Sequence, residues 1–457
     1  MAKNILIAHY RVGKTDGVSL EIAKRKQIFT QMGHQVYLLS GPNQLGANFV
    51  IDEFEFDNPR IAKLWQNTIN ECRDYDSSEG LKKDLFTVKE QIEQKLDRIF
   101  SSHDFDIIYV HNMLSMAINL AATIALVTVI TRYNLPCVAV HHDFYWEGDI
   151  STTPTFPFVE DLIQEYLVPK LPQVKHVTIN TLNHEKLLRE RGIEAQVNYD
   201  VFDFHQPRWN VDEYNRDFRK IIGLQENDIM ILQSTRIVPN KTIEFAIEFV
   251  YQLQKLRHQL ENTRLYHGKQ FHPSNRIVLV LSGYTEAARS WYKECLQRFA
   301  KERNIHALFL EDQDRIRPFR TIRENTRYFS CWDPYVFADL VTFPSIWEGW
   351  GNQFIETIFA KKPIVVFEYP VFKKDIVPEG YQVISLGDKY TPAQDYGLCS
   401  LPNDTAREAA QQAINVLLDR KKYEEIVETN FCFGEKNHSY TTLKRYLYDT
   451  LTWADSC

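Results

Sequence analysis

Hydrophobic positions along this chain form two patterns: short apolar runs, and stretches in which apolar residues recur at helical spacing. Short apolar runs with the length and composition of buried strands occur in both halves. They lie at residues 5–8, 36–39, 107–110, 138–141 and 177–180 in the first half, and at 230–233, 277–281, 307–310, 340–343 and 364–367 in the second. Stretches with apolar residues at helical spacing separate them, such as 19–32, 91–100 and 352–360. This alternation predicts parallel sheets with right-handed helical crossovers, and hence an α/β protein of two doubly wound, Rossmann-like domains.

The length of the chain agrees with two domains. A chain of 457 residues exceeds the usual size of one domain, and its 44% hydrophobic and 25% charged residues are ordinary for a globular protein. We predict a first domain at 1–205 and a second at 206–432, because Pro207 and a polar stretch follow the first. The most apolar run, 117–130, is shorter than the ~20 residues that span a bilayer, so it predicts a buried helix rather than an integral membrane segment.

The net charge and the cysteine content bear on nucleic-acid binding and on cellular location. The net charge of -7 gives no indication of nucleic-acid binding. The seven cysteines are scattered, odd in number and without C-x-x-C pairing, which is typical of reduced thiols in a cytoplasmic protein. We therefore expect a cytoplasmic protein that binds no nucleic acid.

Two carboxylates, Glu348 and Glu356, frame a glycine-rich turn after the strand predicted at 340–343. Glu348 lies in the loop and Glu356 in the helix that follows, with Gly351 and Asn352 between them. Such a loop presents backbone N–H groups at the positive end of a helix, where a phosphate or sugar hydroxyls can bind. Acids at this spacing also occur by chance on solvated helices. Here, however, strands on both sides place the loop at the edge where α/β sheets bind ligands.

A second group of charged residues follows the strand predicted at 230–233. Arg236 lies at the end of this strand and Lys241 at the start of the next helix. The two cations can converge on a pyrophosphate and neutralise it without a metal, although two exposed cations are the simpler interpretation of the residues alone. His142 and Asp143 end the strand predicted at 138–141 and form a further candidate site.

The acidic pair resembles the E-x7-E signature of the retaining GT-B glycosyltransferases of family 4. The segment 234–241 is similar to the G-R-L-x-x-x-K element of that family, with Thr235 in place of the usual Gly. The resemblance implies a GT-B fold, in which two Rossmann-like domains face a cleft and a C-terminal helix, at 433–457, returns to the first domain. It also implies transfer of a hexose from a nucleotide-diphosphate sugar to a hydroxyl of a small-molecule or glycan acceptor, with retention by a front-face route.

The resemblance assigns roles on the donor side. Arg236 and Lys241 would stabilise the departing diphosphate, while Glu348 would orient hydroxyls of the donor sugar and Glu356 the ribose. Further donor contacts are implied at Gly283, Leu310, Gly351 and Asn352, with Leu310 near the base.

The first half contributes other candidates. His142 matches the H-D element of the family and would contact the donor sugar. Gly17 lies in a loop, 11–18, that is similar to the glycine loop facing the acceptor and diphosphate, although Asp16 stands where a first glycine is usual. His111 and Asp143 are candidate contacts to the acceptor or the sugar.

The donor is expected to be the only co-substrate, with no cofactor and no metal. Asp312 and Asp314 could form a D-x-D metal motif, but we interpret them as part of an acidic surface loop. GDP-mannose and UDP-glucose are the expected donors. The segments 141–147 and 348–352 are similar to enzymes that build small solute glycosides, such as mannosylglucosylglycerate synthases.

Two alternatives belong to other classes of protein. Residues 8–15 satisfy a relaxed Walker A pattern after a strand, so a P-loop NTPase is possible. The loop lacks internal glycines, however, and the strand at 107–110 runs into His111 rather than the acid of a Walker B site. A catalytically inactive GT-B sugar-binding protein is the other alternative. The presence together of Arg236, Lys241, Glu348 and Glu356 argues against it.

Overall fold

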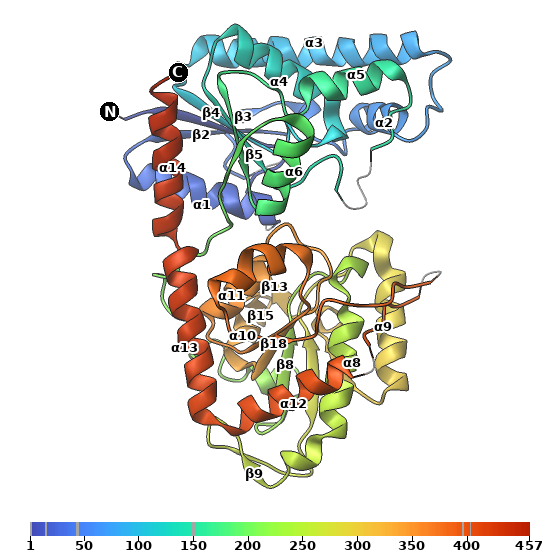
Figure 1. Cartoon of the computed structure of the whole chain (residues 1–457), viewed down its shortest axis with the longest axis vertical. Helices are drawn as coiled ribbons and strands as arrows, with labels where there is room; N and C mark the ends of the chain where they lie inside the picture. Colours follow the sequence, from blue (N-terminus) through green and yellow to red (C-terminus); the bar gives the residue numbers. More distant parts are fainter. Residues whose placement is uncertain (1, 14–15, 43–44, 148–151, 395–396, 403) are drawn as a thin grey trace. The chain divides into compact units, whose positions relative to one another are not determined.

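The computed structural model describes residues 2–13, 16–42, 45–147, 152–394, 397–402 and 404–457 (Figure 1). The chain forms two compact units. Unit 1 comprises Met1–Val201 with Tyr440–Cys457, and unit 2 comprises Phe202–Ser439. Relative to the boundaries predicted at 205 and 433, the chain enters unit 2 slightly earlier and leaves it slightly later, because α13 (Arg420–Asn437) still packs against α11 (Asn352–Phe359) of unit 2.

Unit 1 is built on a seven-stranded sheet in the order β3-β2-β1-β4-β5-β6-β7, whose strand pairs are all parallel. The strands are β1 (Asn4–Ala8), β2 (Gln35–Ser40), β3 (Phe49–Val50), β4 (Ile107–His111), β5 (Cys137–His141), β6 (Val174–Thr178) and β7 (Ala195–Val197). The helices are α1 (Gly17–Gln31), α2 (Pro59–Thr68), α3 (Ser78–Ser102), α4 (Leu120–Arg132), α5 (Pro157–Tyr166), α6 (Thr181–Arg191) and α14 (Tyr440–Ala454). Because β1 lies between β2 and β4, the strand order reverses there, and the loops after β1 and β4 flank the usual ligand position of such sheets.

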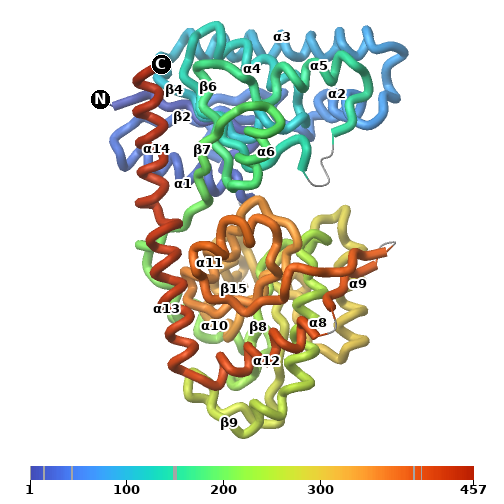
Figure 2. Tube along the Cα trace, in the orientation of Figure 1, coloured from blue at the N-terminus to red at the C-terminus, as the bar shows by residue number. Residues whose placement is uncertain are grey.

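Alternate residues of the strands in unit 1 enter two cores, one on each face of the sheet. Leu6 and Ala8 join a core that also contains the apolar faces of α3, α4 and α5. Ile5 and Ile7 join a second core with residues of α1 and α14. Figure 2 shows α1 and α14 side by side, although they come from opposite ends of the chain. The apolar run at 117–130 forms a buried helix, as predicted.

Unit 2 is built on a six-stranded parallel sheet in the order β12-β11-β8-β16-β17-β18. Its strands are β8 (Ile229–Gln233), β11 (Ile277–Leu281), β12 (His306–Phe309), β16 (Leu340–Phe343), β17 (Ile364–Val366) and β18 (Ile384–Ser385). The other helices are α7 (Phe218–Ile221), α8 (Ile243–Lys255), α9 (Ser290–Glu302), α10 (Asp333–Phe337) and α12 (Thr405–Leu418). The strand order reverses between β8 and β16, so the loops after these two strands meet at one edge of the sheet.

The parallel sheets and the main strands agree with the prediction, whereas several details differ. The strand predicted at 177–180 lies at Val174–Thr178, because Asn180 instead caps α6 by accepting from the backbone N–H of Asn183. The helix predicted at 91–100 is the second half of α3, which has 25 residues. Small strands went unpredicted, including β9 (Thr263–Arg264) with β10 (Gln270–Phe271), and the sheet of β13 (Ile316–Arg317), β14 (Thr321–Arg323) and β15 (Thr326–Ser330).

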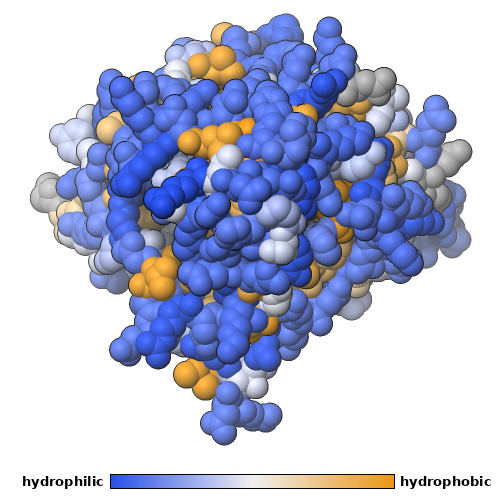
Figure 3. All heavy atoms as spheres, turned by 90° about the horizontal axis from the view of Figure 1, so that it is seen from below, coloured by the Kyte–Doolittle hydropathy of each residue, from blue (hydrophilic) through white to orange (hydrophobic). Residues whose placement is uncertain are grey.

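The surface is mainly hydrophilic on the face drawn in Figure 3, where apolar side chains gather only in small separate groups. Within the described ranges, every helix is either too short or too polar to cross a membrane.

Candidate active site

The loops after β8 and β16 in unit 2 are joined by hydrogen bonds. The Thr242 hydroxyl donates to the carbonyl oxygen of Pro344 at 2.6 Å, and the N–H of Ile346 donates to the carbonyl oxygen of Asn240 at 3.3 Å. Thr242 has a φ of 38°, a left-handed conformation that turns the chain from this loop into α8. These contacts hold the segment that carries Lys241 against the segment that carries Glu348.

Lys241 and Glu348 form an ion pair that is largely withdrawn from solvent. The side chains are only 10% and 14% exposed, and the Lys241 ammonium donates to Oε1 of Glu348. Removing either charge would leave the other partly desolvated and unpaired. The structure therefore brings together one predicted diphosphate contact and one predicted sugar contact.

Gly351 shapes the turn between Glu348 and α11. Its φ is 136°, and a Cβ at this position would lie 2.6 Å from the hydroxyl of Tyr369 and 3.1 Å from the ring of Phe343. The same Tyr369 hydroxyl donates to the carbonyl oxygen of Trp350. A side chain at 351 would thus clash with the groups that fix the turn, so the position requires glycine. Asn352 begins α11, as predicted, and the positive end of the helix dipole lies at this turn.

Arg236 does not contact Lys241 or Glu348 in this structure. Its guanidinium pairs with Glu286, and the side chain is 49% exposed. Its loop is packed tightly against the turn at Gly283, where a Cβ would lie 1.7 Å from the carbonyl oxygen of Thr235. Gly283 is therefore required for this close approach.

Glu356 lies in α11 and accepts a hydrogen bond from the hydroxyl of Tyr335 at 3.0 Å. The same hydroxyl lies 2.6 Å from Oγ of Ser234, which follows β8. Burial raises the pKa of Tyr335 well above its ordinary value, so the phenol keeps its proton. Tyr335 was not predicted as part of the site, because nothing in its local sequence marks it.

Leu310 and the acidic loop lie at the end of β12. The Leu310 side chain is fully buried in the core of unit 2, so only its backbone is available to a ligand. Asp312 pairs with Lys293, and Asp314 pairs with Arg317 at 2.7 Å. Among the residues described, no group of His, Cys, Asp and Glu is arranged to hold a metal ion.

In unit 1, His111 and His142 lie in contact at the carboxyl ends of β4 and β5. Nδ1 of His111 lies 3.0 Å from Nε2 of His142. Burial lowers the pKa of both imidazoles well below the ordinary value, and the charge of Arg25 contributes in the same direction. Both side chains are therefore neutral at pH 7 and share one N–H between them. His142 can act as a hydrogen-bonding group and not as a cation.

The neighbouring His141 has a structural role. The ring of His176 must donate from Nε2 to the carbonyl oxygen of Pro169, at 3.1 Å, so its Nδ1 accepts from Nε2 of His141 at 2.9 Å. This assignment places the single proton of a neutral His141 on Nε2. Of the two adjacent histidines, His142 therefore remains the candidate for a substrate contact.

Asn112 fixes the positions of His142 and Asp143. Its Oδ1 accepts from their backbone N–H groups at 2.8 and 3.1 Å, and its Nδ2 donates to Oδ2 of Asp143 at 2.8 Å. Asn112 has a φ of 57°, which asparagine tolerates better than most residues. The sequence prediction missed it, although an Asn directly after a candidate His at a strand end was an available signal.

Gly17 begins α1, and Asp16 caps this helix by accepting from the backbone N–H of Ser19 at 3.0 Å. The capping role accounts for an acid where the family has glycine. Lys14 and Thr15, which complete the Walker A pattern, lie outside the described residues.

A buried charged cluster on α1 was also missed. Glu21 pairs with Arg25 at 2.9 Å, and both side chains are almost fully buried. Burial, with a further contribution from the charge of Glu21, raises the pKa of the nearby Asp200 to about 8. A Glu and an Arg four residues apart normally lie on the solvated face of a helix, so the sequence predicts exposed side chains here.

The chain is similar in sequence to two known enzymes. The chain is 35% identical to mannosylglucosylglycerate synthase of Petrotoga mobilis over 414 residues, which cover 90% of this chain and 93% of that protein. It is 34% identical to mannosylglucosylglycerate synthase of Thermotoga maritima over 445 residues, which cover 97% and 98%. The chain belongs to this family of glycosyltransferases. No family model matches the chain.

Solved structures agree on the fold. A glycosyltransferase from Rickettsia africae superposes with a TM-score of 0.61 at 14% identity, covering 99% of this chain and 98% of that chain. The Anabaena protein HepE, in complex with UDP and glucose, superposes with a TM-score of 0.57 at 13% identity, covering 98% and 99%. Both the GT-B fold and the glycosyltransferase class predicted from the sequence are therefore confirmed.

Proposed function

We propose that the chain is a retaining, metal-independent hexosyltransferase that transfers mannose from a nucleotide-diphosphate donor to a hydroxyl of glucosylglycerate. The name of the two relatives, which match nearly the whole chain, supports this acceptor and this sugar. The observation that carries the chemistry is the desolvated pair of Lys241 and Glu348 at the carboxyl edge of the unit 2 sheet. GDP-mannose is the first donor to test, and UDP-glucose is the second.

The ion pair supplies a way to couple donor binding to sugar positioning. The diphosphate carries more negative charge than Glu348, so it competes for the Lys241 ammonium when it binds. Glu348 then loses its cation and becomes an acceptor for sugar hydroxyls. Arg236 exchanges Glu286 for the diphosphate, while Gly351 and Asn352 at the start of α11 stabilise its charge.

The reaction balances without a protein nucleophile. The bond between the anomeric carbon and the diphosphate oxygen breaks, and the acceptor oxygen bonds to the anomeric carbon on the same face. The acceptor proton passes to an oxygen of the departing diphosphate. Glu356, oriented by Tyr335, would bind the ribose, with the backbone near Gly283 and Leu310 beside the nucleotide.

Residues of unit 1 are proposed as substrate contacts. His142 would contact the sugar through its hydrogen-bonding edge, with His111 and Asp143 as acceptor or sugar contacts and Gly17 near the diphosphate. The neutral state of His142 supports hydrogen bonding to hydroxyls. A cytoplasmic location is proposed as well, and the seven free thiols support it.

The test combines donor binding with product analysis. GDP, UDP and ADP should be compared by thermal shift, because a nucleotide that binds the folded state raises the melting temperature. GDP should give the largest rise. Turnover of GDP-mannose with glucosylglycerate should persist in EDTA. The one-bond C1–H1 coupling of the transferred mannose, measured by NMR, should show the anomeric configuration of the donor. Inversion, or loss of activity in EDTA that magnesium restores, would contradict the proposed route.

A further inference from the structure

A pocket in unit 2 lies away from the candidate active site, at the opposite edge of the sheet. It has a volume of about 390 Å³ and is lined by 208–211, by Val336 at the end of α10, and by 359–362 between α11 and β17. α11 begins at the loop after β16, at the carboxyl edge of the sheet, and its far end leads to the start of β17. The pocket is therefore separated from Glu348 by the length of α11.

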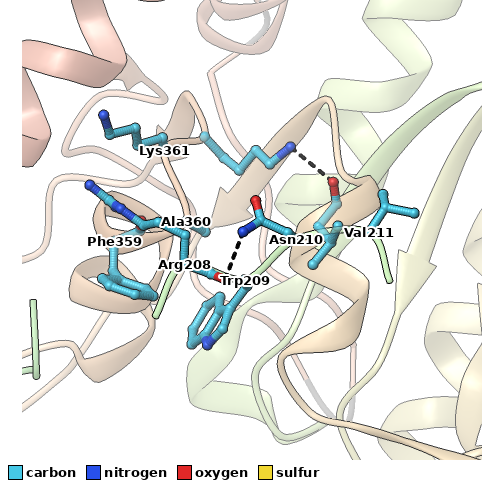
Figure 4. A pocket seen from close by; sticks show the side chains of 9 residues that line it. Arg208, Trp209, Asn210, Val211, Phe359, Ala360 and Lys361 are labelled. Atoms are coloured by element: carbon cyan, nitrogen blue, oxygen red, sulfur yellow. Dashed lines mark hydrogen bonds between the residues drawn. The ribbon is translucent and has the colours of Figure 1, made fainter. Parts of the chain in front are cut away.

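The charged side chains that line this pocket are all cations. They are Arg208, Lys361 and Lys362, and no acid accompanies them among the described lining residues. Figure 4 shows Arg208, Phe359 and Lys361 on one side of the pocket and Asn210 with Val211 on the other, with Trp209 between them. A pocket of this size that combines several cations with an indole ring suits a small organic anion.

Two of the cations are held by neighbours. Arg208 donates to the carbonyl oxygen of Phe359 at 2.8 Å, and its guanidinium lies 3.6 Å from the centre of the Phe431 ring. Lys361 pairs with Glu428. These contacts reduce the freedom of both side chains. Glu428 offsets the charge of Lys361, and the charges of Glu428 and Glu435 also act on Arg208. Lys362 is therefore the main candidate to bind an anion in the pocket.

Lys362 differs because no carboxylate of the described chain pairs with it. Its ammonium donates to the carbonyl oxygen of Val336 at 3.2 Å. Burial lowers the pKa of Lys362 to about 8, while nearby Asp339 acts to raise it and Arg219 to lower it. An ammonium has three N–H donors, so Lys362 can bind an anion in the pocket without breaking its bond to Val336.

We propose that this pocket is a binding site for a phosphate group, free or carried by a small metabolite. The phosphate accepts from the Lys362 ammonium, with the guanidinium of Arg208 on the pocket wall, and the Trp209 ring borders the remainder of a larger ligand. The proposal does not depend on the activity proposed above, because the pocket shares no residue with the donor site.

Competitive labelling of amines in the whole protein tests the proposal. Lys362 should react with acetic anhydride, and peptide mass spectrometry should report its rate beside that of Lys373, a surface lysine paired with Asp388 at 2.6 Å. Phosphate at nine times its dissociation constant should slow labelling of Lys362 about tenfold and leave Lys373 unchanged. Potassium chloride at matched ionic strength should protect neither. Equal rates with and without 50 mM phosphate, a roughly saturating level for a weak site, would overturn the proposal.

Variants separate this site from the donor site. Lys362→Met should abolish the heat of phosphate binding in calorimetry, whereas Lys373→Met should retain it. Lys241→Met should keep phosphate binding at the pocket while it loses binding of nucleoside diphosphates. Phosphate binding by Lys362→Met at wild-type strength would overturn the assignment.

Free phosphate and glucose 6-phosphate, run as separate titrations, distinguish a site for the ion from one for a phosphorylated sugar.

The pH dependence of phosphate affinity provides an independent test. Phosphate gains negative charge as pH rises, so attraction to a permanent cation such as Arg208 would strengthen. Attraction to Lys362 instead weakens above pH 8, where this lysine loses its proton. The affinity should fall between pH 8 and pH 9 in the wild type. A continuous increase across this range would show that Lys362 is not the binding group.

Discussion

At the residue scale, the pair of Lys241 and Glu348 gives the sharpest prediction. Lys241→Met should leave the Glu348 carboxylate largely desolvated and unpaired, which costs about 2–4 kcal/mol of unfolding free energy. Turnover should fall by about 10²–10³ through loss of a charge that stabilises the diphosphate. The double variant Lys241→Met/Glu348→Gln should regain most of the stability and none of the activity. Denaturant unfolding and steady-state kinetics measure the two effects, and additive losses of stability would show that the two charges are not coupled.

Substitutions of Glu348 and Glu356 should affect different kinetic constants. Glu348→Gln should reduce kcat, because the contact serves the reacting sugar, whereas Glu356→Ala should raise KM for the donor by weakening the nucleotide contact. Tyr335→Phe removes only the hydroxyl that orients Glu356, so it should raise KM by a smaller factor of about 3–10. Nucleotide affinity from calorimetry provides the comparison. Equal loss of affinity in the Glu348 and Glu356 variants, with unchanged kcat, would exclude these roles.

A third residue prediction concerns the close approach at Gly283. Gly283→Ala places a Cβ where the Thr235 carbonyl oxygen lies, so the loop that carries Arg236 must move. Donor affinity should fall at least about tenfold, with a loss of about 1–3 kcal/mol in stability. Gly80→Ala, in the first turn of α3, is the matched control. Its Cβ would make only ordinary contacts with Ser77 and Tyr75, and alanine favours helix. Wild-type donor affinity in Gly283→Ala would show that this contact does not position Arg236.

At the element scale, much of the fold and part of the site could be predicted from sequence. Central strands such as β8 and β16 are short apolar runs that the sequence predicts. Their order in the sheet brings Lys241 to Glu348, a contact that was not predicted. Edge strands such as β3 and β18 have only two residues and lack a recognisable period. Tyr335 went unpredicted because its role comes from tertiary contacts, whereas Asn112 was missed although it directly follows the candidate His111. The pairing of Arg236 with Glu286 likewise depends on how two loops pack.

Lys362, in the connection from α11 to β17, should make the stability of the protein depend on pH. Burial lowers the pKa of Lys362 to about 8 from 10.5, so the folded protein binds fewer protons than the unfolded chain between these values. Stability therefore rises with pH across this window, and the destabilisation by Lys362 is fully present below pH 8. Lys362→Met should be more stable than wild type by about 1–3 kcal/mol at pH 7, with the difference vanishing above pH 10.5. Urea unfolding of both proteins from pH 7 to 11 measures it, and a constant difference would show that Lys362 is not buried as a cation.

At the scale of the whole molecule, the chain returns to unit 1 after completing unit 2, and α14 closes one core of the first sheet. Leu443, Leu447 and Leu451 are buried among residues of α1 and the sheet. The Tyr109 hydroxyl lies 2.6 Å from Oγ1 of Thr450. Each buried leucine contributes about 1.5–3 kcal/mol, so the helix as a whole accounts for a large part of the ~5–15 kcal/mol that stabilises a typical domain.

Deletion of residues 440–457 should therefore unfold unit 1 and leave unit 2 folded. The described hydrophobic cluster of unit 2 that contains Met230, Leu232 and Val341 has no residue of the deleted segment, so β8 and β16 keep these partners. Hydrogen exchange should rise in β4 and β5 while β8 and β16 stay protected. Because Lys241, Glu348 and Glu356 lie in unit 2, the truncated protein should still bind a nucleoside diphosphate, although turnover is lost. Tyr448→Ala, at a position 64% exposed on the same helix, is the control and should exchange like the wild type. If β8 and β16 lost protection together with β4 and β5, the two units would fold as one cooperative whole, and the donor-binding half would depend on the last helix of the chain.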